Sequence, residues 1–424
     1  MSVAVADACA LVQDVEARAV RATHLHVGDA KIYPGMAERS VSAVAGYRWV
    51  INMDGFERRY CATGHETYLL AGNRIGRIAR RMIAVNLMDS TIRHTDLHRR
   101  TLLLASVAAL AGCTAASTRR GVETLVPMLD AAAFIAADGA RLPYRAWLPA
   151  GPPRAIVLAL HGFNDCRDAW ELPGPEFADA GIALYASDQR GFGAAPGRGL
   201  WPGADALADD AAELIELLRT RHPGLPIIAM GESMGGAVLM HMATRGGAPQ
   251  NITYVMLAPA VWGRARMNMA MRASLAVARR LVPGMLLGGP PSRLVRILPS
   301  DNRDALIRLA NNPLHIRLTR TDTTAGLVDL MDIALAAAPR FRAPALFLYG
   351  ANDDLVPKPA TRATWRSLPD GLAQRAYYHR GYHLLLRDLS RAIPTRDIIS
   401  WIQNPDRPLP SGAQHAASAW MAGA

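Results

Sequence analysis

The stretch GESMGG at residues 231–236 places Ser233 between glycines, directly after the apolar run PIIAM. A serine hydroxyl is a poor nucleophile at neutral pH, because it needs a base to take its proton and a carboxylate to orient that base. Ser233 follows a predicted strand and precedes a predicted helix, which is the context of a nucleophile on a sharp strand-to-helix turn. The alternative is a Gly-Ser turn without chemistry, since chance supplies such a string in roughly one chain in ten of this length. A base and an acid elsewhere in the chain decide between the two.

His383, in the stretch RGYHLLLRD, is the histidine best placed to be the base. It lies in a predicted loop between the last predicted strand and a helix, from which an imidazole reaches across the strand ends. His379 lies four residues earlier, within or beside that strand, and is the weaker candidate. His161 ends the first predicted parallel strand, and we expect it to be structural.

Two neighbouring carboxylates, Asp353 and Asp354, follow the apolar run PALFLYG and are the candidates for the acid. The chain order Ser233, Asp353, His383 is the order that accompanies this kind of serine turn. Asp-rich turns are also common at strand ends without any chemistry. The spacing alone therefore leaves both aspartates open.

The negative charge that develops on the substrate oxygen needs backbone N–H donors. We expect these donors from Met234, directly after the serine, and from Phe163 in the loop HGFND. The sequence contains no HExxH motif, and GFGAAPG has the wrong glycine spacing for a dinucleotide site. We therefore expect no catalytic metal and no dinucleotide site.

The elements that must position these residues begin at about residue 131. Continuous apolar runs such as AIVLALHGF (155–163) and ITYVMLAPA alternate with helix-period stretches such as ADDAAELIELLRTRHP. Fully apolar strands alternating with amphipathic helices are typical of a parallel sheet covered on both faces. The predicted fold class is therefore α/β, and in such sheets functional residues gather at the carboxyl ends of the strands.

An interruption at about residues 261–335 separates two of the predicted strands and is too long for a plain connection. It opens with a Met- and Leu-rich stretch and contains helical segments near DALIRLA and LVDLMDIALAAA. Met-rich surfaces adapt to flexible apolar ligands, so we interpret the interruption as a helical lid over an apolar pocket. The alternative is an extra layer of core packing without substrate contact.

Assembled in order, the stretches HGFND, DQRGFGAAPGRGLWPG, GESMGG, GANDDLVP and GYHLLLRD resemble the α/β-hydrolase family, in particular its lysophospholipase and monoacylglycerol-lipase branch of the serine aminopeptidase S33 type. The resemblance covers about residues 131–405. It implies a mostly parallel twisted sheet with helices on both faces, a helical cap insertion and cleavage of carboxylic esters through an acyl-serine intermediate. It also implies no cofactor, and its Gly-x-x-Asp-x-x-Val-Pro turn, counted from Gly350, places the acid at Asp353.

Residues 97–113, LHRRTLLLASVAALAGC, have the order of a secretory signal: a basic start, a short apolar run and a small-residue end. The end resembles a bacterial lipobox, in which Cys113 is lipidated, and the RR-T-LLL arrangement weakly resembles a twin-arginine signal. The alternative is a short buried helix. The signal implies a bacterial envelope protein anchored to the membrane by lipid, and a cytoplasmic protein if the signal is not used.

Signals belong at an N-terminus, whereas this one begins near residue 88. Residues 1–87 show no repeat and no catalytic motif, so we interpret them as an over-extended gene model in which Met88, or Met82, is the natural start. The predicted organisation is a doubtful extension at 1–87, a signal at 88–113, a linker at 114–130, a hydrolase domain at 131–405 and a flexible tail at 406–424.

The formal net charge of +11 invites a nucleic-acid interpretation. The basic residues are almost all arginines scattered along the chain, with lysine only at 31 and 358. No nucleic-acid-binding motif of aromatic residues interleaved with basic ones accompanies them. We therefore expect no nucleic-acid partner.

The expected function is hydrolysis of lipid-like esters, monoacylglycerol or lysophospholipid. The alternatives are a short-acyl carboxylesterase, thioesterase or aminopeptidase-like hydrolase, and a non-catalytic envelope binding protein.

Overall fold

The structure is a computed structural model that describes residues 47–53, 56–63, 66–70, 118–288 and 298–423. It divides into a unit over residues 1–97 and a larger unit over residues 98–424. In the first unit the described backbone forms an antiparallel sheet of β1 (Tyr47–Met53), β2 (Phe56–Thr63) and β3 (Glu66–Leu70), in that order. The predicted signal at 88–113, with Cys113, lies outside the described residues.

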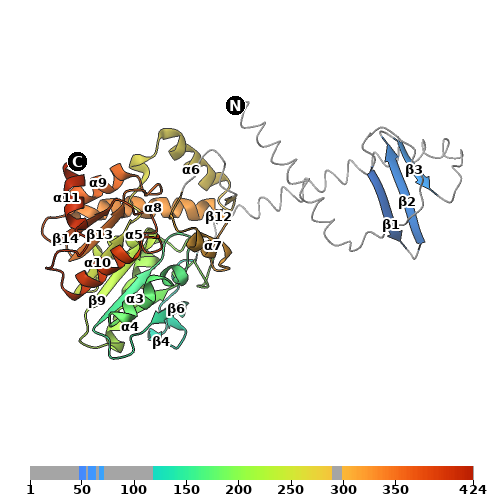
Figure 1. Ribbon diagram of the computed structural model, residues 1–424. Helices are drawn as coiled ribbons and strands as arrows, with labels where there is room; N and C mark the ends of the chain where they lie inside the picture. The colour runs from blue at the N-terminus through green and yellow to red at the C-terminus, as the bar shows by residue number, and fades with distance from the viewer. Residues whose placement is uncertain (1–46, 54–55, 64–65, 71–117, 289–297, 424) are drawn as a thin grey trace. The chain divides into compact units, whose positions relative to one another are not determined.

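The larger unit is built on a nine-stranded sheet with the order β14-β13-β10-β9-β7-β8-β6-β5-β4 (Figure 1). Within this sheet the six strands β14, β13, β10, β9, β7 and β8 pair in parallel. Strands β6, β5 and β4 add an antiparallel edge. Their bounds are β4 Met128–Leu129, β5 Ala133–Ile135, β6 Arg141–Trp147, β7 Ala155–Leu160, β8 Ile182–Ser187, β9 Ile227–Glu232, β10 Ile252–Leu257, β13 Ala345–Gly350 and β14 Ala373–Tyr378.

The central strands are apolar over most of their length because both faces of the sheet are covered. Every residue of β7, β8, β9 and β13 is buried. One face packs on α4 (Ala204–Arg221), α5 (Met234–Ala243) and α8 (Thr321–Ala337), and also on α9 (Lys358–Ser367) and α11 (Ala413–Ala422). The other face packs on α3 (Pro173–Asp179) and α10 (Ala392–Gln403). The predicted α/β fold with helices on both faces is confirmed.

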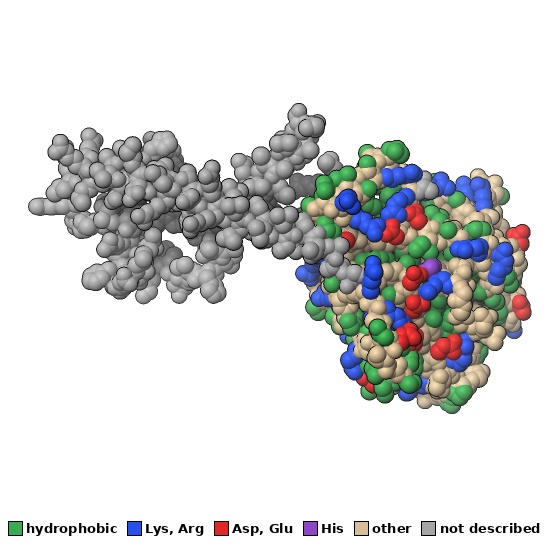
Figure 2. Space-filling view, turned by 180° about the vertical axis from the view of Figure 1, so that it is seen from behind, with side chains coloured by type: hydrophobic (Ala, Val, Ile, Leu, Met, Phe, Trp, Pro, Cys, Tyr) green, Lys and Arg blue, Asp and Glu red, His purple; other side chains and the backbone are tan. Residues whose placement is uncertain are grey.

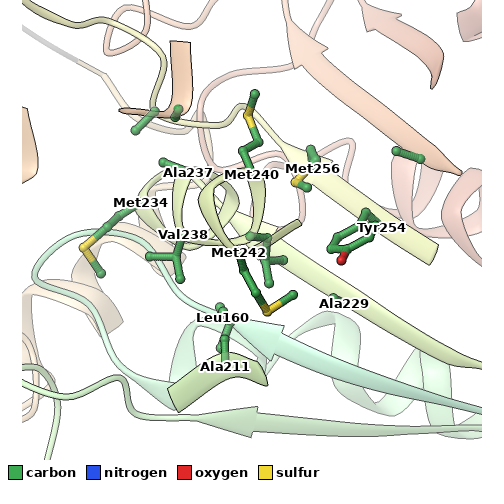
Figure 3. Packing of buried hydrophobic residues seen from close by; sticks show 14 of the residues in the cluster. Leu160, Ala211, Ala229, Met234, Ala237, Val238, Met240, Met242, Tyr254 and Met256 are labelled. Carbon is green, nitrogen blue, oxygen red and sulfur yellow. The ribbon is translucent and has the colours of Figure 1, made fainter. Parts of the chain in front are cut away.

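Helix α5 lies in the middle of the first of these two cores. Figure 3 shows its apolar side chains, among them Val238, Met240 and Met242, beside Leu160 of β7 and Met256 of β10. All five side chains are at most 2% exposed. This packing fixes the helix that follows the serine turn against the strands that precede and flank it.

The interruption between β10 and β13 contains α6 (Met269–Leu281), β11 (Leu286–Leu287), α7 (Arg303–Asn311), β12 (Thr319–Arg320) and α8. Its parts differ in burial. Helix α6 has no buried residue and α7 has only Ala305, whereas α8 contributes Leu330 and Ala334 to the core against α5. The predicted cap therefore has an outer part, α6 and α7, and an inner part, α8, that is the packing layer of the alternative interpretation.

The prediction of a flexible tail at 406–424 is wrong for α11. Trp420 is 6% exposed and stacks on Tyr377 with ring centroids 4.8 Å apart. The Arg362 guanidinium lies over the Trp420 ring, 4.6 Å from its centroid. Ala413, Ala417 and Trp420 share the buried face at helical spacing. The Ala-rich composition conceals this face, because alanine gives little hydrophobic contrast between one side of a helix and the other.

The linker predicted at 114–130 is bound to the domain over its described part. Arg120 pairs with Asp210 at 3.2 Å and with Glu213 at 2.8 Å on α4, and β4 pairs with β5.

No helix within the described residues has the length and apolarity that a membrane span requires. On the face drawn in Figure 2, Lys and Arg side chains lie among acidic and apolar ones and form no continuous basic stripe.

Candidate active site

Ser233 occupies the turn between β9 and α5 with φ 53° and ψ −111°. A non-glycine residue in this region of backbone conformation is strained by about 1–3 kcal/mol and persists only where the surroundings impose it. Here the Ser233 N–H donates to the Leu257 carbonyl at 2.9 Å, and the Ser233 carbonyl accepts from the N–H of Ala260 at 2.9 Å and of Ala237 at 3.1 Å. The strained turn is therefore held by backbone bonds to β10, the segment after it and α5.

The two glycines of the turn are required by close packing. A Cβ on Gly231 would lie 2.5 Å from the backbone of Gly235 and Gly236, and a Cβ on Gly235 would lie 2.3 Å from the Leu160 carbonyl oxygen of β7. Neither approach leaves room for a side chain. The Gly-x-Ser-x-Gly spacing thus lets α5 cross the end of the sheet closely enough to present the serine at the carboxyl edge.

Asp353 and His383 lie together at the same edge, on the loops that follow β13 and β14. The His383 Nδ1 lies 2.8 Å from the Asp353 Oδ2, and both residues are at most 4% exposed. The other oxygen of Asp353, Oδ1, accepts the backbone N–H groups of Leu355 at 2.8 Å and Val356 at 2.9 Å. All of these contacts orient the carboxylate toward the imidazole.

The weaker candidates are not part of this arrangement. Asp354 and His379 are exposed, and the ring of His379 packs edge-on against Tyr377. His161 is fully buried, with Nδ1 2.7 Å from the Gly162 carbonyl, and its Nε2 accepts the Gln189 N–H at 3.1 Å. Both imidazole nitrogens of His161 are therefore occupied by backbone, in keeping with a structural role.

The environment raises the pKa of His383. Burial disfavours the imidazolium, but the negative charge of Asp353 and the hydrogen bond to it outweigh burial, and the charge of Glu232 adds to the rise. Since Nδ1 faces Asp353, Nε2 is the nitrogen that can exchange a proton with a serine. An imidazole in this setting becomes a stronger base than a free histidine.

A row of backbone hydrogen bonds connects the serine turn to the loops of the acid and the base. Ser233 bonds to Leu257 at the end of β10, Ala258 bonds to Leu348 of β13, and Ala351 bonds to Tyr378 of β14, each at 2.9 Å. The chain order of the four strands is interrupted by the cap, yet β9, β10, β13 and β14 are consecutive neighbours in the sheet. The strand order therefore brings residues 233, 353 and 383 to one edge.

The two N–H groups predicted to bind the oxyanion, those of Met234 and Phe163, belong to segments that adjoin Ser233. Met234 is the first residue of α5, where backbone N–H groups have no partner within the helix and favour negative charge. A Cβ on Gly162 would lie 3.5 Å from the Ser233 Cβ, so the loop before Phe163 runs directly against the serine. The Phe163 ring packs against Phe192 at 5.6 Å between centroids, which anchors this loop.

A buried charge cluster beneath these loops was not anticipated from the sequence. The Arg387 guanidinium pairs with Asp165 at 2.7 Å and with Glu232 at 2.5 Å, and none of the three side chains is more than 7% exposed. Asp165 belongs to the HGFND loop, Glu232 precedes Ser233, and Arg387 follows His383 by four residues. Arg387 therefore connects three of the segments that meet at the site, those that follow β7, β9 and β14.

Opposite effects act on the two carboxylates of this cluster. Burial raises the pKa of Glu232 despite the nearby Arg387, whereas at Asp165 the charge of Arg387 outweighs burial and lowers the pKa. A signal for the cluster was present in the sequence, since Glu232 is a charged residue at the end of an otherwise apolar strand. A buried charge in that position requires a partner.

The cap is attached to the same loops at two places. In its middle, the Ser300 hydroxyl donates to Asp388 at 2.6 Å, and burial raises the pKa of Asp388 to about 6. Further along the cap, the N–H of Ile316 donates to the Asn164 carbonyl at 2.9 Å, and the Asn164 amide donates to the Thr319 hydroxyl at 2.6 Å. The cap is thus fixed to the loop of the predicted oxyanion donor and to the loop of the base.

The fold and the arrangement at its carboxyl edge are those of an α/β-hydrolase. The family model described as serine aminopeptidase, S33, matches residues 151–390, and the chain belongs to this family. The match spans Ser233, Asp353 and His383 together with the cap. The resemblance drawn from the sequence motifs is therefore confirmed at the level of fold and family.

Curated relatives and solved structures agree with this assignment. The chain is 24% identical over 274 residues to a monoacylglycerol lipase of Mycolicibacterium smegmatis, covering 63% of this chain and 95% of the relative. It is 25% identical over 305 residues to the monoglyceride lipase of Mus musculus, covering 68% and 95%. The crystal structure of the Paleococcus ferrophilus monoacylglycerol lipase superposes with a TM-score of 0.53 at 25% identity, covering 62% of this chain and 98% of that one.

Proposed function

We propose that this chain is a serine hydrolase that cleaves carboxylic esters of lipid-like substrates, monoacylglycerol or lysophospholipid, with Ser233, His383 and Asp353 as its catalytic residues. The observation that carries the proposal is the buried Asp353–His383 pair, at 2.8 Å, on the same edge of the sheet as the strained Ser233 turn. Family membership and relatives named as monoacylglycerol lipases support the same chemistry.

The reaction proceeds in two halves. The Ser233 Oγ attacks the ester carbonyl carbon while its proton passes to the His383 Nε2, and Asp353 stabilises the imidazolium. The N–H groups of Met234 and Phe163 donate to the oxygen of the tetrahedral intermediate. The intermediate collapses to an acyl-serine, and the proton on His383 leaves with the alcohol. A water molecule then attacks the acyl-serine and gives a proton to the His383 Nε2. As the second tetrahedral intermediate collapses, His383 returns this proton to the Ser233 Oγ, and the carboxylic acid leaves.

The cap supports an apolar substrate. Helix α6 has no buried residue and exposes Met269, Met271 and Leu281 to 76, 41 and 65%. Single exposed apolar residues are ordinary, but several on one helix of the cap insertion favour contact with an apolar ligand or a lipid surface. The alternative of a short-acyl esterase, thioesterase or aminopeptidase-like enzyme does not explain why these apolar side chains are exposed.

A substrate series tests the proposal. Esters of one alcohol with acyl chains of increasing length are compared with monoacylglycerol, lysophospholipid and an N-terminal peptide amide, by kcat/KM. The proposal expects kcat/KM to rise with acyl length and peptide cleavage to be negligible. A maximum at acetyl or butyryl esters, or a preference for the peptide, would assign one of the alternative activities instead.

The lipid anchor at Cys113 belongs to the same proposal, although this residue lies outside the described residues. It is supported by the basic, apolar and small-residue order of 97–113. Metabolic labelling with an alkyne fatty acid in a bacterial host, followed by mass spectrometry of the mature N-terminus, tests it. We expect a lipidated Cys113 as the first residue and no label in Cys113→Ala. Abundant peptides from residues 20–80 in the mature protein contradict both the anchor and the late start.

A further inference from the structure

We propose that the hollow beside the cap binds the phosphate of a lysophospholipid head group through Arg198 and Arg317. This inference rests on the proposed function and names the substrate class within it. The hollow has a volume of about 660 Å³ and is lined by Arg198, Arg317, Arg320 and His315 together with apolar side chains that include Ile316 and Leu318. A volume of this size lies in the range of small-molecule sites, about 300–1,000 Å³.

The lining carries uncompensated positive charge. It contains three arginines and no carboxylate. Arg320 is paired with Asp322 at 2.7 Å, whereas Arg198 and Arg317 take part in none of the ion pairs formed among the described residues. Arginines without a carboxylate partner in a hollow attract an anion, and the guanidinium fork matches the geometry of a phosphate.

The two guanidinium groups are held in place by backbone carbonyls. Arg198 donates from Nη2 to the carbonyls of Pro313 at 2.7 Å and His315 at 3.2 Å. Arg317 donates from Nε and Nη2 to the Ala310 carbonyl at 3.1 and 2.6 Å. A guanidinium has five N–H donors, so each group keeps donors for a ligand while its position is fixed. Pre-positioned donors lower the entropy cost of binding an anion.

The hollow adjoins the active-site loops. Ile316, part of its wall, donates to the Asn164 carbonyl at 2.9 Å. Asn164 is two residues from Gly162, which packs against the Ser233 side chain. Two residues of chain span at most about 7 Å, so the wall lies on the order of 12 Å from the serine. The proposal places the phosphate of the head group in this hollow while the ester is at Ser233.

The neutral apolar part of the wall separates this site from a simple anion patch. Leu286, Ile316 and Leu318 line the same hollow as the two arginines. An inorganic phosphate gains nothing from these side chains, whereas a glycerol backbone with its first acyl carbons contacts them. The chemistry therefore favours a phosphate that is part of a lipid over a free phosphate ion.

The test compares two substrates that differ only by a phosphate: 1-decanoylglycerol and 1-decanoyl-lysophosphatidic acid, each below its critical micelle concentration. We expect the double variant Arg198→Gln, Arg317→Gln to lower the ratio of kcat/KM for the phosphate-bearing substrate over the neutral one by at least about tenfold, since losing even one charge-assisted hydrogen bond has that effect. The matched control is Arg342→Gln. Arg342 is also exposed and bonded to backbone carbonyls, but it lies at the amino end of β13, away from Ser233. An unchanged ratio in the double variant overturns the proposal.

Binding measured without turnover separates this inference from the proposed function. The dissociation constant of dodecyl phosphate is measured by calorimetry in the Ser233→Ala background, with and without the two arginine substitutions. We expect about tenfold weaker binding in their presence. Equal binding overturns the phosphate site even if esters are cleaved, and wild-type protein that cleaves no ester overturns the function even if dodecyl phosphate binds through the arginines. If inorganic phosphate binds as tightly as dodecyl phosphate, the head-group assignment is wrong and the site serves free phosphate.

Discussion

Replacing Arg387 by methionine removes the guanidinium of the buried cluster that joins the segments after β7, β9 and β14. Methionine keeps an extended apolar side chain but leaves Asp165 and Glu232 buried without the guanidinium that lies 2.7 and 2.5 Å from them. Breaking a buried ion pair by removing one partner typically costs about 3–5 kcal/mol. That is a large share of a stability of about 5–15 kcal/mol for a folded domain.

The cost can be bounded through protonation. A carboxylate that cannot remain charged in the core takes up a proton, and each pH unit above its ordinary pKa of about 4.3 costs about 1.36 kcal/mol. Protonating Glu232 therefore costs about 4 kcal/mol at pH 7 and about 1 kcal/mol at pH 5. In the variant the folded state binds more protons than the unfolded state, so its stability falls as pH rises through this window. The deficit relative to wild type is thus expected to be largest at neutral pH.

Urea denaturation followed by tryptophan fluorescence measures this deficit at pH 7 and pH 5, with wild type at the same pH as reference. The matched control is Arg391→Met, because Arg391 lies 3.6 Å from Glu176 with both side chains about one-third exposed. Such a pair is worth less than about 1 kcal/mol. A loss below about 1 kcal/mol for Arg387→Met at pH 7, or a loss that does not shrink at pH 5, refutes this account of the cluster.

Three further predictions concern the acid, the base and the C-terminal helix. Asp353→Asn is expected to lower kcat on a soluble ester by about 10⁴-fold, as removal of the orienting carboxylate does in a serine protease. Asp354→Asn is expected to leave kcat nearly unchanged. The opposite ranking moves the role of the acid to Asp354. Asp353 raises the pKa of His383, and the base must be neutral to act. The acidic limb of the profile of kcat/KM against pH should therefore have its midpoint above the ordinary histidine pKa of about 6.5. A midpoint below that value contradicts the assignment of His383 as the base. Trp420→Ala should lower the free energy of unfolding by about 3–5 kcal/mol in thermal or urea denaturation, and a change within about 0.5 kcal/mol would show that α11 does not hold the core as described.

The strands and the serine turn were predictable because their determinants are local. A strand buried on both faces is apolar almost throughout, as β7 and β13 are and as β9 is up to Glu232. The close approach of α5 to β7 requires Gly235. The order of the motifs then identified His383 as the candidate base. It did not distinguish Asp353 from Asp354, and only the turn motif of the family favoured Asp353. The structure separates them physically, since one is buried against His383 and the other is exposed.

The parts that the sequence did not reveal depend on contacts between distant segments. Arg387 meets Glu232 across 155 residues and Asp165 across a longer separation, and nothing in the local sequence of RGYHLLLRD identifies those partners. The same holds for Arg120, whose partners lie on α4, and for Trp420, whose partners lie on two strands and α9. In the cap, apolar composition alone could not distinguish the exposed α6 from the buried α8.

The central claim is that Ser233 takes the acyl group of a lipid ester. The most direct measurement is acyl transfer to that residue: monoacylglycerol is mixed with wild type and with Ser233→Ala, released fatty acid is quantified, and a fluorophosphonate probe is mapped by mass spectrometry. We predict one probe per wild-type chain on Ser233, together with fatty-acid release. We predict that Ser233→Ala keeps the wild-type circular dichroism spectrum and loses both signals. A folded Ser233→Ala protein that still releases fatty acid, or a probe attached to another residue of the wild type, contradicts the claim.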